Sequence, residues 1–179
     1  EMELNGLVDR EKLLKISGRS RKPQMELAEK WGIKEYPSPA GGCKLTEPNY
    51  SIRLRDALNR NENLTQKEID LLRFGRHFIS SNNVKIIVTR TAEEGTEIKK
   101  ILSKEDLVFL PSHFNGAMAI IHGDAKDKDK ELACKLVSRY SKGRDEAEVD
   151  VKFGNFGTPF KNELRVKPAT EEEVSKYLL

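Results

Sequence analysis

Hydrophobic side chains in the first half of the chain recur every three or four residues, with charged side chains between them. This spacing is typical of amphipathic helices. It predicts three helices, over residues 24–31, 51–60 and 66–74. Pro23 suits the first turn of the first helix, and Thr65 with Glu68 forms the pattern of a capping box before the third. We expect a further short element over residues 7–16.

The pattern changes after the polar segment of residues 80–83. From there, short runs of β-branched side chains alternate with helical segments, which predicts strands between helices. We expect strands over residues 84–90, 107–110, 117–122, 148–153 and 163–167. We expect helices over residues 92–102 and 130–140, and a last one after a capping box at Thr170. This change predicts an α/β chain of the α+β type with two domains: a small, mostly helical part (1–81) and an α+β domain (82–179).

Composition excludes several classes of protein. Of the 179 residues, 34% are charged and 37% hydrophobic, and no apolar run approaches the roughly 18 residues that span a membrane. The two distant cysteines fit a reducing compartment better than a disulfide framework, so we expect a cytoplasmic protein with no membrane partner. The formal net charge of +3 is only mildly basic, so a nucleic-acid partner must be argued from where the cations lie.

Cys43 is the candidate catalytic residue, because it follows Gly41 and Gly42 in a proline-rich loop. Glycine lets the backbone pass close to a ligand, and an accessible thiol beside cations is reactive. The alternative is a tight turn followed by a small buried hydrophobe, and spacing leaves both open. Cys134 falls on the apolar face of the helix at 130–140 and is predicted to be structural. The histidines are not spaced as metal ligands with one another or with either cysteine, so no metal site is expected.

Three groups of cations are candidate RNA contacts. One precedes the first helix, where free backbone N–H groups also attract phosphate. The second lies on the helix at 51–60, and the third follows the helix at 130–140. The groups are Arg19, Arg21 and Lys22; Arg53 and Arg55; and Lys142 and Arg144. Each is equally compatible with an ordinary solvated surface.

Two stretches of the first half resemble a known family. They are Gly18-Arg19-Ser20-Arg21-Lys22-Pro23-Gln24 with Leu27-Ala28, and Ser38-Pro39-Ala40-Gly41-Gly42-Cys43-Lys44-Leu45-Thr46. Over about residues 4–80, they resemble the end of the PP-loop ATPase domain of tRNA 2-thiouridylases. The resemblance implies that Cys43 carries a persulfide, and that the sulfur of this persulfide passes to an ATP-activated uridine of tRNA. Cations such as Lys44 are expected to lower the pKa of the Cys43 thiol.

That resemblance also implies ATP with magnesium as the cofactor of a longer protein, and tRNA and a sulfur-donor protein as partners. The chain has no Ser-Gly-Gly-x-Asp-Ser type PP-loop. We therefore expect a C-terminal fragment that binds no cofactor and has no turnover of its own.

A series of short blocks marks the second half. They are Asp106-Leu107-Val108-Phe109, Gly116, Ile120-Ile121-His122-Gly123, Glu131-Leu132-Ala133, Tyr140-Ser141-Lys142 and Val149-Asp150-Val151. In this order, they resemble the RNA-binding domain of NFACT-type proteins over about residues 84–155. That family is associated with RNA, notably tRNA, and not with catalysis. Two functions are therefore open: part of a tRNA sulfurtransferase with Cys43 as its sulfur carrier, or a non-catalytic RNA-binding module in which Cys43 is structural.

Overall fold

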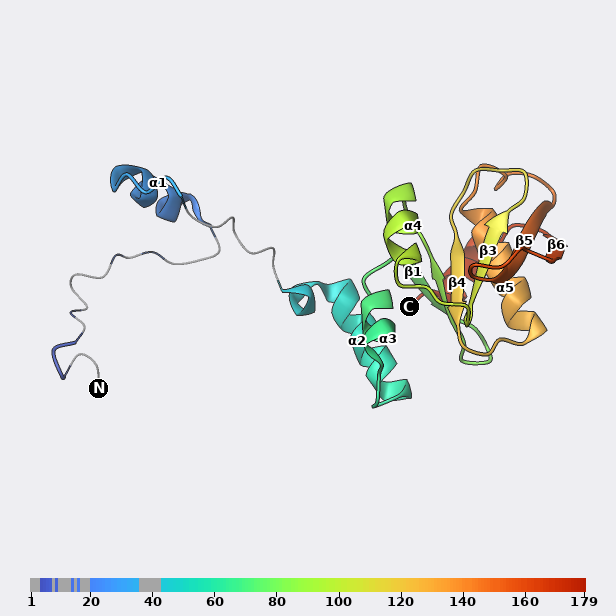
Figure 1. Ribbon diagram of the computed structural model, residues 1–179, viewed down its shortest axis with the longest axis horizontal. Coiled ribbons are helices and arrows are strands. Elements are labelled where there is room, and N and C mark those ends of the chain that lie inside the picture. Colours follow the sequence, from blue (N-terminus) through green and yellow to red (C-terminus); the bar gives the residue numbers. More distant parts are fainter. Residues whose placement is uncertain (1–3, 8, 10–13, 15, 17–19, 36–42) are drawn as a thin grey trace. The chain divides into compact units, whose positions relative to one another are not determined.

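The computed structural model describes residues 4–7, 9, 14, 16, 20–35 and 43–179. The chain divides into two compact units, Glu1–Gly42 and Cys43–Leu179. In the first unit, α1 (Lys22–Lys30) is the predicted helix, with Pro23 in its first turn and Gly32 at a φ of 70° just beyond its end (Figure 1). No residue of α1 is buried. The element expected over residues 7–16 lies mostly outside the described residues.

The second unit is built on a six-stranded sheet with helices on both faces. Its strands are β1 (Arg76–Ile79), β2 (Lys85–Val88), β3 (Asp106–Pro111), β4 (Ala119–His122), β5 (Val149–Asn155) and β6 (Asn162–Val166). Its helices are the short 3₁₀ helix η2 (Lys44–Thr46), α2 (Pro48–Arg60), α3 (Gln66–Leu71), α4 (Ala92–Lys99), α5 (Asp127–Arg139) and α6 (Glu171–Tyr177). The strand order is β1-β2-β4-β3-β5-β6, and all neighbouring strands are antiparallel. The predicted α+β class is confirmed.

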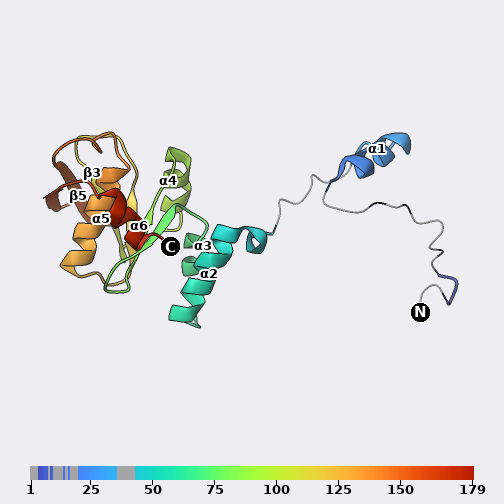
Figure 2. The same ribbon diagram turned by 180° about the vertical axis from the view of Figure 1, so that it is seen from behind.

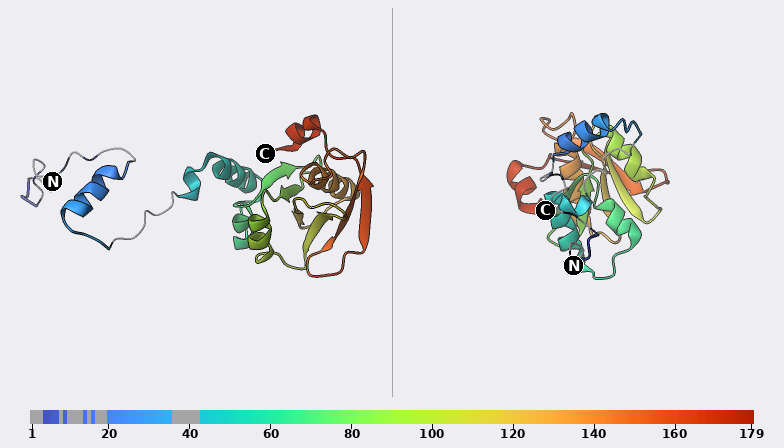
Figure 3. Two further views of the ribbon diagram at one scale, coloured as in Figure 1. Left: turned by 90° about the horizontal axis from the view of Figure 1, so that it is seen from above. Right: turned by 90° about the vertical axis from the view of Figure 1, so that its left-hand side faces the viewer.

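Both faces of the sheet are buried, each against different helices. Alternate side chains of a strand point to opposite faces, so Phe78, Phe109 and Ile121 pack with the apolar face of α5 and with α6. Figure 2 shows α5 and α6 in front of the sheet, and Figure 3 shows α5 within the curve of the sheet. On the other face, Val108 and Ile120 pack with residues of α3 and α4.

Local sequence signals place several helix ends as predicted. Thr65 and Thr170 form complete capping boxes with Glu68 and Glu173 at the starts of α3 and α6. Each box satisfies backbone N–H groups that have no partner inside the helix. Within the described residues, every helix is too short or too polar to cross a membrane.

The segment after α3 departs from the prediction. The helix expected to continue to residue 74 ends at Leu71, and β1 follows Gly75. Gly75 has a φ of 66°, and a Cβ there would lie 2.5 Å from the carbonyl oxygen of Val88 in β2. Only glycine therefore permits this turn beside the neighbouring strand. Beyond β1, the C-terminal residues close the sheet edge, where the Leu179 N–H donates to the His77 carbonyl oxygen at 2.9 Å.

The predicted domain boundary between residues 81 and 82 falls inside a hairpin. β1 pairs with β2 through the turn at residues 80–83, where the Ser80 N–H donates to the Val84 carbonyl oxygen at 2.9 Å. Phe78 of β1 is fully buried in the core shared with α5. The structure therefore divides the chain after Gly42 and not after residue 81.

Candidate functional site

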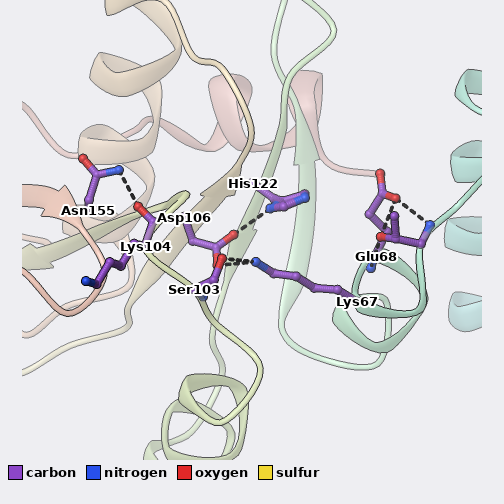
Figure 4. Close-up of polar contacts among 8 residues, drawn as sticks. Lys67, Glu68, Ser103, Lys104, Asp106, His122 and Asn155 are labelled. Atoms are coloured by element: carbon purple, nitrogen blue, oxygen red, sulfur yellow. Dashed lines mark hydrogen bonds and ion pairs between the residues drawn. The ribbon is translucent and has the colours of Figure 1, made fainter.

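A buried carboxylate, Asp106, is the centre of a polar network at one end of the sheet (Figure 4). Asp106 begins β3 and lies opposite His122, the last residue of β4. Its Oδ1 accepts a hydrogen bond from His122 Nδ1 at 2.7 Å. Its Oδ2 accepts from Lys67 Nζ and from the Ser103 backbone N–H, both at 2.6 Å. Asp106 is 0% exposed, and a buried carboxylate keeps its charge only where such donors surround it.

The protonation of the Asp106–His122 pair follows from this geometry. Burial raises the pKa of Asp106, but hydrogen bonds from Lys67, Ser103 and His122, with the charge of Lys67, bring that pKa below its ordinary value. The ionised carboxylate can only accept hydrogen bonds, so His122 Nδ1 carries the shared proton. The other ring nitrogen, Nε2, points away from Asp106 (Figure 4) and has no hydrogen-bond partner among the described residues.

A pocket of about 240 Å³ adjoins His122 and is bounded by residues of α2, α3 and β2. Apolar side chains cover part of its wall: Ala57, Leu64, Leu71, Val84 and Ile87. Its polar and charged residues are Arg60, Asn61, Glu68, Asn83, Lys85, His122 and Asp124. The two cations, Arg60 and Lys85, are balanced by the two carboxylates, Glu68 and Asp124. The pocket is therefore mixed in polarity and has no formal excess of charge.

The cations of the pocket are already bound to other groups. Arg60 Nε donates to both carboxylate oxygens of Asp56 at 2.9 Å, and Arg60 Nη1 donates to the backbone carbonyl and side-chain oxygens of Asn83. Lys85 Nζ lies 3.8 Å from Asp56. Burial lowers the pKa of Lys85, and the nearby Asp56 opposes this shift.

The two carboxylates of the pocket, Glu68 and Asp124, differ in their hydrogen bonding and exposure. Glu68 is held by the capping box, where its Oε2 accepts hydrogen bonds from the Thr65 N–H and Oγ1 at 2.7 Å. Burial raises the pKa of Glu68, but these hydrogen bonds and the charges of His122 and Lys85 lower it overall. Asp124 is exposed and has no hydrogen bond or ion pair within the described part of the chain. His122 Nε2 and the Asp124 carboxylate are therefore available to form hydrogen bonds with a ligand.

None of the predicted site residues that the structure describes lines this pocket. Arg19 lies outside the described residues, and Arg21 and Lys22 lie at the start of α1 in the first unit. Arg53 is half-buried, and its Nη1 donates to the Leu72 carbonyl oxygen at 3.2 Å. Arg55 is exposed. Residues two apart on a helix do not share a face, so these two arginines do not form one patch.

Lys142 and Arg144 lie together on an exposed turn after α5. The Lys142 N–H donates to the Asn115 carbonyl oxygen at 2.9 Å. A Cβ at Gly143, between them, would lie 2.6 Å from the Phe114 ring. The turn is thus fixed by backbone contacts while both side chains remain exposed. Arg144 Nε lies 3.4 Å from Asp145 Oδ2, and Lys142 has no ion pair among the residues that the structure describes.

The two cysteines differ as their surroundings predict. Cys134 is buried, as expected from its helix face, and burial raises the pKa of its thiol to about 12. Cys43 is exposed, while residues 36–42 of its loop lie outside the described residues. Lys44, expected to activate Cys43, instead forms an ion pair with Glu47, with Nζ 2.7 Å from Oε1. The catalytic role of Cys43 stays a prediction.

Neither Asp106 nor His122 is among the predicted site residues, although both lie in the blocks that carry the second resemblance. The antiparallel pairing of the two predicted strands was the available signal, because pairing outward from their turn brings these residues opposite each other. Lys67 comes from a helix 39 positions before Asp106. No local pattern marks it.

Comparisons with known proteins agree with the second resemblance only. The family model described as "NFACT protein RNA binding domain" matches residues 75–178. This match begins before β1 and leaves out residues 4–74, so it gives no support to the resemblance to the tRNA 2-thiouridylases. No curated protein matches the chain.

One similar solved structure is "The structure of the C-terminal of the fibronectin/fibrinogen-binding protein from Streptococcus suis", at 19% identity and a TM-score of 0.53. The match covers 73% of this chain and 60% of that one. At this identity, the similarity shows a shared fold.

Proposed function

Because the chain belongs to the NFACT protein RNA-binding domain family, we propose that it binds RNA, and tRNA in particular, through its second unit. The observation that carries the proposal is the extent of the family match. It runs from Gly75, before β1, to Leu178, after α6, and so includes the whole sheet.

Phosphate contacts supply the affinity in this proposal, because RNA backbones attract cations whatever their sequence. The cations that suit this role are exposed and not held by a carboxylate. Lys142 meets both conditions, and Arg144 has only an exposed contact with Asp145, in which both side chains are more than half exposed. Arg55 on α2 is a further candidate in the second unit, and Arg21 with Lys22, at the start of α1, would add contacts from the first unit. Arg53 is better explained as a structural residue, since it binds the end of α3.

The test is the salt dependence of tRNA binding to the full chain. The slope of log K against log salt is about −0.7 to −0.9 for each phosphate neutralised. Three contacts would therefore weaken binding about twentyfold to fortyfold over a fourfold rise in salt. Replacing both Lys142 and Arg144 with alanine should lower the affinity and reduce the slope by up to about 2.

The matched control replaces Lys135 and Arg139 with alanine. It removes the same charge, but these cations pair with Glu173 and Glu171 at 2.5 and 2.7 Å. We expect a smaller loss of affinity and an unchanged slope. Equal effects of the two double variants would contradict the assignment of Lys142 and Arg144, and no binding of tRNA at low salt would contradict the proposed function.

A second candidate function is tRNA thiolation with Cys43 as the sulfur carrier, which the exposure of its thiol favours. This function would use ATP with magnesium and a sulfur-donor protein, both bound by parts of a longer protein. Its support within this chain is limited to that exposure, so RNA binding without catalysis is the stronger candidate.

A further inference from the structure

We propose that the pocket beside His122 receives an unpaired nucleobase of the bound RNA. The proposal rests on the RNA-binding function above and names a part of the RNA that the family match leaves open. The occupant follows from the size, the charge balance and the free polar atoms of the pocket.

The volume suits a single ring system. Pockets for drug-sized ligands enclose about 300–1,000 Å³, and this pocket, at about 240 Å³, is smaller. The apolar wall formed by Leu64, Leu71 and Ile87 can cover the face of a flat ring. Proteins that read RNA by sequence commonly bind bases that have left the stack, through their faces and edges.

The charges argue against a phosphate as the occupant. Arg60 is engaged by Asp56 and Asn83, and the charges of Glu68 and Asp124 balance those of Arg60 and Lys85. A phosphate site requires cations that are free to pair with it. A neutral ring with N–H groups at its edge requires hydrogen-bond acceptors instead; the Asp124 carboxylate and, in the neutral imidazole, His122 Nε2 provide them.

His122 Nε2, the atom that would contact the base, is held in place before any ligand binds. Asp106 holds the His122 ring by its Nδ1, and Lys67 and Ser103 hold Asp106 in turn. Nε2 is therefore fixed at the pocket at little entropic cost on binding. In this arrangement, Asp106 is a positioning residue, while His122 and Asp124 contact the base.

Two RNA hairpins test the proposal, one with a single bulged nucleotide and one with the same stem fully paired. Binding of each to the full chain is measured by fluorescence anisotropy at low salt. Two hydrogen bonds to the base should make the bulged RNA bind about tenfold more tightly. His122→Ala and Asp124→Asn should each remove most of this preference. Asp124 is exposed, so its isosteric replacement leaves the fold unchanged.

The controls repeat both substitutions outside the pocket. His113→Ala changes an exposed histidine of the β3–β4 loop, and Asp127→Asn changes an exposed carboxylate in the first turn of α5. Both should retain the preference for the bulged RNA.

The failures of the two proposals are distinguishable. Equal binding of the two hairpins by the unmodified chain would overturn the nucleobase pocket and leave RNA binding in place. If the chain binds neither hairpin, the proposed RNA-binding function is overturned, and the proposal that an RNA base occupies the pocket is overturned as well. Competition with free nucleosides tests whether the ring in the pocket comes from an unpaired base of RNA. Displacement of the fully paired hairpin by a nucleoside would contradict this.

Discussion

Replacing Lys67 with methionine tests what holds the Asp106 network together. The substitution keeps most of the aliphatic side chain and removes the ammonium group. Lys67 Nζ lies 2.6 Å from Asp106 Oδ2 and 2.7 Å from Ser103 Oγ, and Asp106 is fully buried. In the variant, the buried carboxylate keeps only its hydrogen bonds with Ser103 and His122.

The expected loss of stability lies between two limits. A hydrogen bond to a charged group contributes about 1.5–3 kcal/mol, and removing one partner of a buried ion pair costs about 3–5 kcal/mol. Lys67 is partly exposed, at 22%, and two donors to Asp106 remain. We therefore expect the free energy of unfolding to fall by about 2–3 kcal/mol.

Lys100→Met is the matched control. Lys100 Nζ lies 2.6 Å from Glu97 Oε1, as close as the Lys67 pair, but the two side chains are 65% and 55% exposed. Exposed pairs contribute about 0–1 kcal/mol. Urea unfolding of both variants at neutral pH compares them directly, and an equal loss would refute the argument that burial gives the Asp106 network its strength.

The lowered pKa of Asp106 also predicts how the difference in stability between the unmodified chain and Lys67→Met depends on pH. The stability that an ionised Asp106 contributes is fully present above its unfolded pKa, near 4, and is lost as the pH falls through its lower folded value. Lys67 stabilises the ionised form only. The gap between the unmodified chain and Lys67→Met should therefore be constant above about pH 5 and shrink in stronger acid. A gap independent of pH would contradict the assigned charge state.

Two further outcomes follow from the core and the thiols. A chain of residues 43–179 should unfold cooperatively by thermal melting. Residues 82–179 alone should not, because they lack β1 and the buried Phe78. Cooperative melting of the shorter chain would contradict the shared core. Iodoacetamide at neutral pH should modify Cys43 in the folded chain and leave Cys134 unmodified, since Cys134 is buried with a pKa raised to about 12. Equal, slow labelling, measured by mass spectrometry, would remove the support for Cys43 as a sulfur carrier.

Elements with a strong local signal were predictable from the sequence. The capping boxes at Thr65 and Thr170 lie where the sequence predicts them, because the hydrogen bonds of a box involve only four consecutive residues. The helix now seen as α5 was predicted for the same reason, since its apolar face recurs with the helical period. These features need no knowledge of the rest of the fold.

β1 and the Asp106 network were not predictable in this way. β1 contains four residues, two of them the cationic or polar Arg76 and His77, and an arginine and a histidine near the end of a predicted helix also suit a helix C-terminus. Its strand character depends on pairing with β2. Similarly, Lys67, Asp106 and His122 meet only through the register of the sheet and the position of α3.

Ion pairs within the second unit limit how it can hold RNA. Lys135 and Arg139 of α5 pair with carboxylates of α6, and Arg165 pairs with Asp150 across β5 and β6. A cation beside a carboxylate gains less from a phosphate, because the carboxylate repels the same ligand. The better phosphate contacts are therefore the exposed cations that have no carboxylate partner among the described residues; besides Lys142, they include Lys104, Lys128 and Lys161.

Phosphate contacts are the same for every RNA sequence, so discrimination between RNAs must come from another source. Shape and unpaired bases are the two features that proteins read in RNA. Among the described residues, His122 and Asp124 line two pockets, and the smaller one, bounded by α2, α3 and β2, has the size that suits a single base. If tRNA binding depends on salt but both hairpins bind equally, the domain reads the shape of the RNA; if the bulged hairpin binds more tightly, selectivity resides in His122 and Asp124.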